Sequence, residues 1–234
     1  MKHLRPAALR IEVLLPAIAI AGLAILIAAF LVSERFMDAP QVEGPWIYGS
    51  GSARFTLTEY ADLECPYCRE YFPQLKGWID QNPEANLKWH HLPLSIHEPA
   101  ASKNAQLVEC IGARNGSGDF WKAVELVYQQ TRGNGAGLAG GLNVSGQDEQ
   151  GLLGAVEYCM TFNEQAAERV KEQAQQAAVL GINATPTIVI TDNKTGRTIK
   201  LTGPADDNAL MSAVDWLAEQ QHDITQQSSG PGAQ

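Results

Sequence analysis

Two cysteines separated by two residues, Cys65 and Cys68, constrain the fold of this chain more than any other feature. The motif directly follows Phe55–Tyr60, in which residues alternate as they do in a strand. Pro66 suits the first turn of a helix, and beyond Cys68 apolar residues recur at helical spacing. The sequence therefore predicts a dithiol at the junction between a strand and a helix whose apolar face packs on a sheet.

This junction gives the two sulfurs different expected environments. Cys65 would lie at the exposed N-cap, where unpaired backbone N–H groups and the helix dipole stabilise a thiolate. Cys68 would begin the buried stripe of the helix. In disulfide exchange we therefore expect Cys65 to attack and Cys68 to resolve the mixed disulfide, with Pro66 and Tyr67 as supporting residues.

The residues alone leave two alternative interpretations of this motif, a zinc site and a structural disulfide. A closed zinc site needs four ligands, but the remaining cysteines, Cys110 and Cys159, are single and far apart. His90 and His91 are adjacent on a predicted strand, so their side chains would point to opposite faces. A purely structural disulfide within the motif would close a very short loop and restrain the unfolded chain little. We predict neither a metal nor a cofactor.

The N-terminal residues have the pattern of a membrane anchor. Residues 13–32 carry no charge, and twenty helical residues span about 30 Å, the thickness of the hydrocarbon core. Lys2, Arg5 and Arg10 precede this run, so residues 1–12 are expected in the cytoplasm and the domain outside it. A cleaved signal peptide is the alternative, but its apolar region is usually about 7–15 residues long. We predict a single-pass protein of the inner or plasma membrane, with its domain on the periplasmic or extracellular side.

The rest of the chain divides into a linker, one domain and a tail. Gly and Pro punctuate residues 33–52, which predicts a linker, and the polar residues 221–234 predict a disordered tail. Between them, over residues 53–220, the order is β-α-β, a helical block at about 99–180, and β-β-α. An α/β domain with a helical insertion accounts for this order. The later predicted elements are strands at Leu87–His91, Thr187–Thr191 and Thr198–Leu201, a helix at Asp207–Gln220, and a mobile loop at Gly133–Gly146.

Net charge excludes one broad class of function. The chain has a formal charge of −9, whereas proteins that bind nucleic acids present clustered Lys and Arg to the phosphates. No long run of like charge occurs, so the acidic residues predict an ordinary solvated surface. Nucleic acid is therefore not an expected partner.

The residues around the dithiol resemble the DsbA-like branch of the thioredoxin superfamily. Leu57–Cys68 is similar to that family's strand and active-site segment, and Trp89–Ala100 to its second strand and the start of its helical insertion. Gly181–Ile190 is similar to its Thr–cis-Pro loop and next strand. The resemblance implies a thioredoxin-like fold with a helical insertion over residues 53–220. It also implies a thiol–disulfide oxidoreductase that acts on cysteine-containing exported proteins.

The resemblance assigns roles to residues outside the motif. Pro186 would be the cis-proline that faces the cysteines, and Thr185 would present its backbone to an extended substrate peptide. Glu59 would lie beneath the dithiol and relay the proton of the buried Cys68. An exposed position on the strand is the alternative for Glu59. We therefore expect Glu59, Thr185 and Pro186 to lie close to the two cysteines.

The remaining candidate residues are expected in supporting positions. Asp62 and Glu64 would lie at the surface and tune the local electric field, and His97 would have a structural role. In an oxidising compartment Cys110 and Cys159 are predicted to form a structural disulfide, which would contribute about 4 kcal/mol. Two buried free thiols are the alternative for that pair.

The sequence leaves the direction of electron flow open. The Pro66-Tyr67 pair and Thr185 resemble disulfide isomerases as much as strong oxidants. Such isomerases usually carry an N-terminal dimerisation domain, and the linker here is too short for one, which favours a monomeric disulfide donor. The expected partner is a membrane redox protein, either a quinone-linked oxidase or a thiol reductant carrier. The alternative from another class is a redox-inert binding module or copper metallochaperone, although the four methionines form no cluster.

Overall fold

The computed structural model describes residues 22–23, 25–27, 44–145 and 150–228, with side chains as far as residue 219. The chain divides into two units, Met1–Gln41 and Val42–Gln234. In the first unit the described residues are helical, and their apolar side chains are exposed. Most of the predicted span 13–32 and all of residues 1–12 lie outside the described residues. Among the residues that are described, no helix is both long and apolar enough to cross a membrane.

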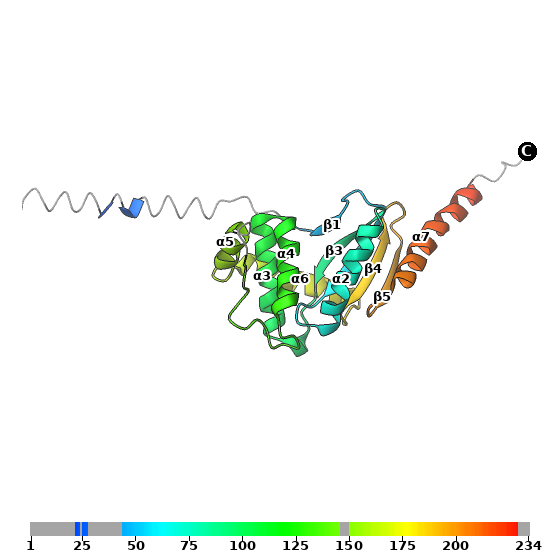
Figure 1. Ribbon diagram of the computed structural model, residues 1–234. Helices are drawn as coiled ribbons and strands as arrows, with labels where there is room; N and C mark the ends of the chain where they lie inside the picture. The colour runs from blue at the N-terminus through cyan, green and yellow to red at the C-terminus, as the bar shows by residue number, and fades with distance from the viewer. Residues whose placement is uncertain (1–21, 24, 28–43, 146–149, 229–234) are drawn as a thin grey trace, which may run out of the picture. The chain divides into compact units, whose positions relative to one another are not determined.

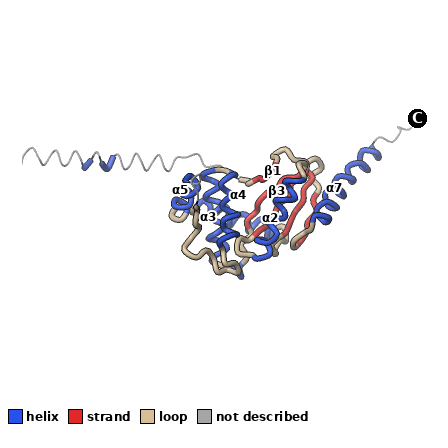
Figure 2. The backbone as a smooth tube through the Cα atoms, viewed as in Figure 1, coloured by secondary structure: helices blue, strands red, loops and turns tan. Residues whose placement is uncertain are grey.

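The second unit is built on a five-stranded sheet in the order β1-β3-β2-β4-β5 (Figures 1 and 2). The central strand β2 is parallel to β3 and antiparallel to β4, which forms a hairpin with β5. Helix α2 connects β2 to β3, and α7 packs against β4 and β5. The bounds are β1 Ile47–Gly49, β2 Phe55–Ala61, α2 Pro66–Gln81, β3 Ala85–His91, β4 Thr187–Asp192, β5 Thr198–Thr202 and α7 Asp207–Ser228.

A helical block separates β3 from β4, as the sequence predicts. It starts with the short 3₁₀ turn η1 and continues through four helices that lie beside the sheet (Figure 1). A disulfide between Cys110 in α3 and Cys159 at the end of α5 joins two of them, so these cysteines are not free thiols. The bounds are η1 Ser95–His97, α3 Ala100–Asn115, α4 Ser117–Gln130, α5 Gln150–Cys159 and α6 Glu164–Val179.

Side-chain alternation along β2 decides what lies on each face of the sheet. Successive strand residues point to opposite faces, so Leu57 and Glu59 share the face that α2 covers. Tyr60 points to the other face, where it packs with Ala177 of α6. A polar residue on the α2 face of this central strand is therefore buried beneath the helix that carries the dithiol.

An aromatic cluster fixes the helical block to the sheet. Trp89 of β3 lies 5.9 Å from Phe72 of α2 and 6.1 Å from both Phe120 and Trp121 of α4, measured between ring centroids. Edge-to-face pairs of buried aromatic rings at such distances are favourable. The cluster therefore holds the helix of the dithiol and the helical block in one core.

Two expectations at the ends of the domain were wrong. Residues 33–52 are not all linker, since β1 lies among them and Trp46 is buried with its ring stacked 4.9 Å from Phe120. A three-residue strand is too short to show a period of two. Residues 221–228 were expected in a disordered tail, but α7 continues to Ser228. Polarity alone does not end a helix, and Gly230 is the first helix-breaking residue beyond this point.

Candidate active site

The two cysteines of the motif occupy the first turn of α2. Cys65 is the N-cap residue, Pro66 is the first residue of the helix, and Cys68 is completely buried. Both thiols are free. Cys65 was expected to be exposed, but only 4% of its surface is accessible. Its Sγ donates a hydrogen bond to the backbone oxygen of Thr185 at 3.5 Å, so the loop that carries Thr185 covers it, while Tyr67 remains 66% exposed.

The surroundings shift the pKa values of the two thiols in opposite directions. A hydrogen bond from the Cys68 thiol lowers the pKa of Cys65 to about 5, although burial opposes the shift. The Thr185 side chain and the backbone N–H groups of Tyr67 and Cys68 act in the same direction. Burial raises the pKa of Cys68 well above its ordinary value, and the negative charges of Cys65 and Glu59 add to this. The site thus contains one ready thiolate and one retained proton.

Glu59 lies where the resemblance implies, in the buried layer beneath the dithiol. None of its surface is accessible, and among the described residues neither carboxyl oxygen has a hydrogen-bond partner. Burial raises the pKa of Glu59 to about 8, and the negative charge on Cys65 acts in the same direction. At neutral pH this carboxyl group therefore holds a proton close to Cys68.

The loop before β4 brings Thr185 and Pro186 to the dithiol. The Thr185–Pro186 peptide bond is cis, and the backbone oxygen of Pro186 accepts a hydrogen bond from Gly203 N at 2.9 Å. Within the described part of the chain the buried Thr185 Oγ1 has no partner in the thiol form, so it can donate to a Cys65 thiolate. The loop therefore shields Cys65 from solvent and supplies a hydroxyl that can donate a hydrogen bond to its thiolate.

Asp62 and Glu64 were expected at the surface, but both are buried. Asp62 accepts hydrogen bonds from the backbone N–H groups of Glu64 at 2.7 Å and Leu94 at 2.9 Å. His97 Nδ1 lies 2.7 Å from the same carboxyl group, so His97 joins the active-site turn to the start of the helical block. Burial raises the pKa of Asp62, and these contacts oppose the shift. The partners of both acids come from distant segments, which a local reading of polarity cannot identify.

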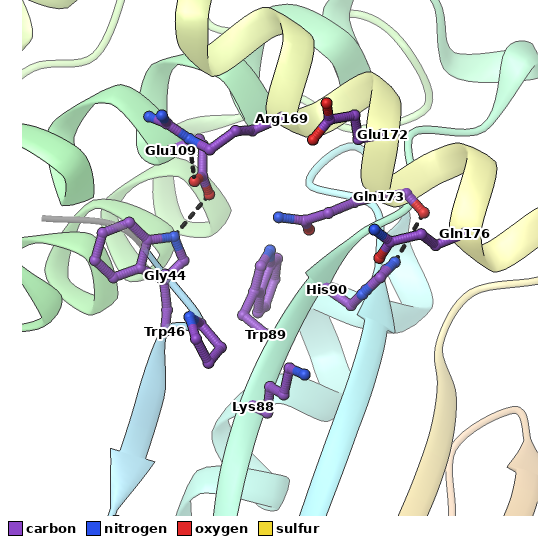
Figure 3. Close-up of a pocket in the computed structure, with 11 residues that line it drawn as sticks. Gly44, Trp46, Lys88, Trp89, His90, Glu109, Arg169, Glu172, Gln173 and Gln176 are labelled. Atoms are coloured by element: carbon purple, nitrogen blue, oxygen red, sulfur yellow. Dashed lines mark hydrogen bonds and ion pairs between the residues drawn. The ribbon is translucent and has the colours of Figure 1, made fainter. Parts of the chain in front are cut away.

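A second polar cluster lies along a pocket of about 470 Å³ between β3, α3 and α6, and no residue of the dithiol lines this pocket (Figure 3). The buried Glu109 accepts hydrogen bonds from Trp46 Nε1 at 2.7 Å and Arg169 Nε at 2.9 Å. His91 Nε2 lies 3.3 Å from the same carboxylate. Burial opposes ionisation, but these contacts outweigh it and hold the pKa of Glu109 below its ordinary value. The cluster connects the start of the domain to two helices.

His90 and His91 are adjacent on β3 but have separate partners. His90 Nε2 lies 2.8 Å from the backbone oxygen of Gln173, whereas His91 Nδ1 accepts a hydrogen bond from Trp89 Nε1 at 2.9 Å. Among the described residues, no group of three His, Cys, Asp or Glu side chains is placed to hold a metal ion. Each histidine instead makes structural contacts on its own face of β3.

This chain aligns with only a small part of each of its curated relatives. A sodium/proton antiporter NhaA 1 of Salinispora arenicola is 31% identical over 99 residues, which is 41% of this chain and 15% of that protein. An antiporter NhaA 1 of Mycolicibacterium gilvum is 26% identical over 180 residues, 72% of this chain and 26% of that protein. The chain therefore spans about a quarter or less of these relatives.

Solved structures and a family model match most of the described domain. Pseudomonas aeruginosa DsbA2 is 46% identical, with a TM-score of 0.68 over 75% of this chain and 94% of that one. Wolbachia pipientis alpha-DsbA1, at 20% identity and a TM-score of 0.57 over 76% of this chain and 93% of that one, shares the fold. The family model described as Thioredoxin matches residues 41–215. The predicted thioredoxin-like fold with a helical insertion is confirmed, and the chain belongs to the thioredoxin family as a DsbA-like member.

Proposed function

We propose that the chain is a thiol–disulfide oxidoreductase that donates disulfides to cysteine-containing exported proteins through Cys65 and Cys68. The observation that carries this proposal is the asymmetry of the pair. Cys65 has a pKa of about 5 at a helix N-terminus, while Cys68 is buried with a raised pKa. Such asymmetry suits a pair in which Cys65 forms the mixed disulfide with the substrate while Cys68 is released and takes up a proton.

The thiol–disulfide exchange proceeds in two steps at Cys65. A substrate thiolate attacks Cys65 Sγ of the oxidised pair, the bond between the two sulfurs breaks, and Cys68 leaves as a thiolate. Glu59, protonated at neutral pH, donates its proton to Cys68. A second substrate thiolate then attacks the substrate sulfur of the mixed disulfide and releases Cys65. Two electrons pass from the substrate dithiol to the pair, and Cys65 leaves readily because its pKa is low.

The substrate would lie as an extended chain along the loop of Thr185 and Pro186. The backbone oxygen of Thr185 is 3.5 Å from Cys65 Sγ, so a peptide paired with this backbone would bring its cysteine to Cys65. Main-chain hydrogen bonds give affinity without demanding a particular sequence. This mode of binding suits an enzyme with many polypeptide substrates.

One observation favours donation over reduction or isomerisation. A low pKa of Cys65 stabilises the reduced form, which makes the oxidised form a stronger oxidant. A pair kept reduced for isomerisation by a thiol reductant carrier is the competing function, and its potential would be lower.

We place the domain outside the cytoplasm, anchored by residues 13–32 in the inner or plasma membrane. Exposed apolar side chains on the described helical residues of this run support the placement, as does the disulfide between Cys110 and Cys159. Structural disulfides persist in oxidising compartments. A quinone-linked membrane oxidase would then reoxidise the pair, since each donated disulfide leaves two electrons on Cys65 and Cys68.

The reduction potential of the Cys65–Cys68 pair tests the direction. It is measured on the full chain in glutathione buffers of known ratio, with Cys65→Ala as the inactive control. We expect about −120 mV, the range of strong disulfide donors. A value of about −200 mV or lower would assign isomerase or reductase work. A pair that does not exchange, with copper(I) bound instead, would support a metallochaperone.

A further inference from the structure

The residue before the nucleophile carries a fully engaged buried carboxylate. Glu64 is 1% exposed, and its Oε1 accepts hydrogen bonds from Asn104 Nδ2 at 2.7 Å and from Thr131 Oγ1. Its Oε2 accepts a hydrogen bond from the backbone N–H of Gly137 at 2.9 Å. All three partners donate, which matches a carboxylate, an acceptor-only group. These partners lie 40 to 73 residues further along the chain.

Two of the three partners belong to one segment, the Gly-rich loop Thr131–Gly141. The backbone oxygen of Glu64 accepts a further hydrogen bond from the N–H of Asn134 at 2.8 Å. A Cβ atom on Gly133 would lie 3.6 Å from that oxygen and 3.9 Å from Pro66 Cγ. The loop therefore hydrogen-bonds to Glu64 and lies beside Pro66, the residues on both sides of Cys65 in the sequence.

The Gly-rich loop depends on anchors outside itself. Five of its glycines have positive φ angles, as does Asn134 at 53°. Such a backbone loses much conformational entropy when it is ordered. Glu64 supplies three anchors, its carboxylate for Thr131 and Gly137 and its carbonyl for Asn134. Arg69 Nη1 adds a contact with the backbone oxygen of Thr131 at 3.3 Å.

Stability alone does not require a carboxylate at this position. Its three donors are neutral groups, and burying an ion without an opposite charge is costly. An apolar residue would fill the same volume without burying a charge, but it would leave Asn104, Thr131 and Gly137 without their acceptor. A buried carboxylate at this position is therefore better explained by the need to hold the loop next to Cys65.

We propose that Glu64 is a positioning residue that holds the Gly-rich loop against the dithiol as one wall of the polypeptide-binding surface. The proposal rests on the oxidoreductase function and extends it. A peptide that lies along Thr185 reaches Cys65, whose neighbours Glu64 and Pro66 contact the loop. The substrate class is therefore an extended polypeptide, which spans both loops, rather than a small thiol, which needs only the sulfur.

The variant Glu64→Gln tests whether Glu64 positions the loop for polypeptide substrates. The amide oxygen can keep Asn104 and Thr131, but the NH₂ group would face the N–H of Gly137, so two donors would oppose each other. We expect KM for reduced, unfolded ribonuclease A to rise about tenfold more than KM for reduced glutathione, with kcat for the polypeptide little changed. Hydrogen exchange at the Gly137 amide should quicken by a similar factor.

Glu70→Gln is the matched control, because it removes the same charge from an exposed position on α2. It should change neither KM. If Glu64→Gln does not fold, Thr131→Val tests the same wall, since it removes a donor to Glu64 and the acceptor of the Gly133 N–H at 3.1 Å.

Equal effects on both substrates, or no effect on either, would overturn the positioning role. So would an unchanged rate of exchange at Gly137. Failure of the proposed function looks different, because the wild-type protein itself would then not react with glutathione.

Discussion

Cys65 and Cys68 lie one turn apart at the start of α2, so the proton on Cys68 can stabilise a negative charge on Cys65. The Cys68 thiol is the largest cause of the low pKa of Cys65. We therefore predict that the rate of alkylation by iodoacetamide rises with a midpoint near pH 5 in the reduced protein. In Cys68→Ala the midpoint should move upward, since the main donor is gone. A wild-type midpoint at the ordinary value of about 8.5 would contradict the prediction.

The sign of the linkage for Cys65 follows from the lowered pKa. A thiol with a depressed folded pKa stabilises the reduced fold fully above its unfolded pKa. That contribution falls as the pH falls through the folded value of about 5. Reduced protein should thus lose this stabilisation on acidification.

Glu59 has the opposite linkage, because its pKa is raised from 4.5 to about 8. The folded state retains the proton while the unfolded state releases it, so stability falls as the pH rises through this window. The loss is on the order of 5 kcal/mol between the two values. Glu59→Gln should remove the loss. The difference between variant and wild type, from urea unfolding of reduced protein at pH 5 and pH 8, measures it, because the opposite contribution of Cys65 is common to both proteins. Parallel pH profiles for Glu59→Gln and wild type would refute the assignment, and Glu70→Gln serves as the control.

Residue positions were predictable where they depend on neighbours in the sequence. The dithiol and its helix position follow from a strand, a proline and apolar spacing within about twenty residues. Pro186 required the family resemblance, since nothing local distinguishes a cis proline. The burial of Asp62 and Glu64 could not be predicted, because their partners His97 and Gly137 are brought to them only by the complete fold.

At the scale of elements, the clearest periodic patterns led to the most accurate bounds. The central strands β2 and β4 were predicted to within one residue, since alternation or a β-branched run defines them. The edge strand β1 was missed, and α7 was predicted too short. In both cases composition was used where no period was available. For β1, pairing with β3 decides the outcome, and that contact is tertiary.

Glu109 joins three elements, so its removal should loosen the fold without touching the dithiol. We predict that Glu109→Gln lowers the free energy of unfolding by about 3 kcal/mol, because Arg169 would lose its buried partner. Its lowered pKa gives stability that is present above the unfolded pKa and is lost as the pH falls through the folded value. The difference between variant and wild type should therefore shrink in acid. Urea unfolding at pH 7 and pH 4 measures it.

Glu172→Gln is the control for that experiment, because Glu172 lines the same pocket on α6 but is exposed (Figure 3). It should change stability by less than about 0.5 kcal/mol. Equal losses for the two variants would show that the contacts of Glu109 do not carry the effect.

At the scale of the whole molecule, the uncharged run at residues 13–32 predicts where the protein is located. We predict that the full chain stays with the membrane fraction after an alkaline carbonate wash, because about twenty apolar residues bury in lipid. Protease added from outside the cytoplasmic membrane should degrade the domain. Release by carbonate, together with a mature chain that lacks the first residues, would show a cleaved signal peptide instead.

The order of the strands has a consequence for how the protein is made. The hydrogen bond that covers Cys65 joins residues 120 apart, and β2 pairs with β4 across a similar separation. A ribosome that synthesises from the N-terminus therefore completes Cys65, Cys68 and Cys110 well before Thr185 or Cys159 exists. During that interval three thiols share an unfinished chain, and Cys110 lacks its partner. The sequence therefore sets the order in which the sulfurs become available, with Cys159 last.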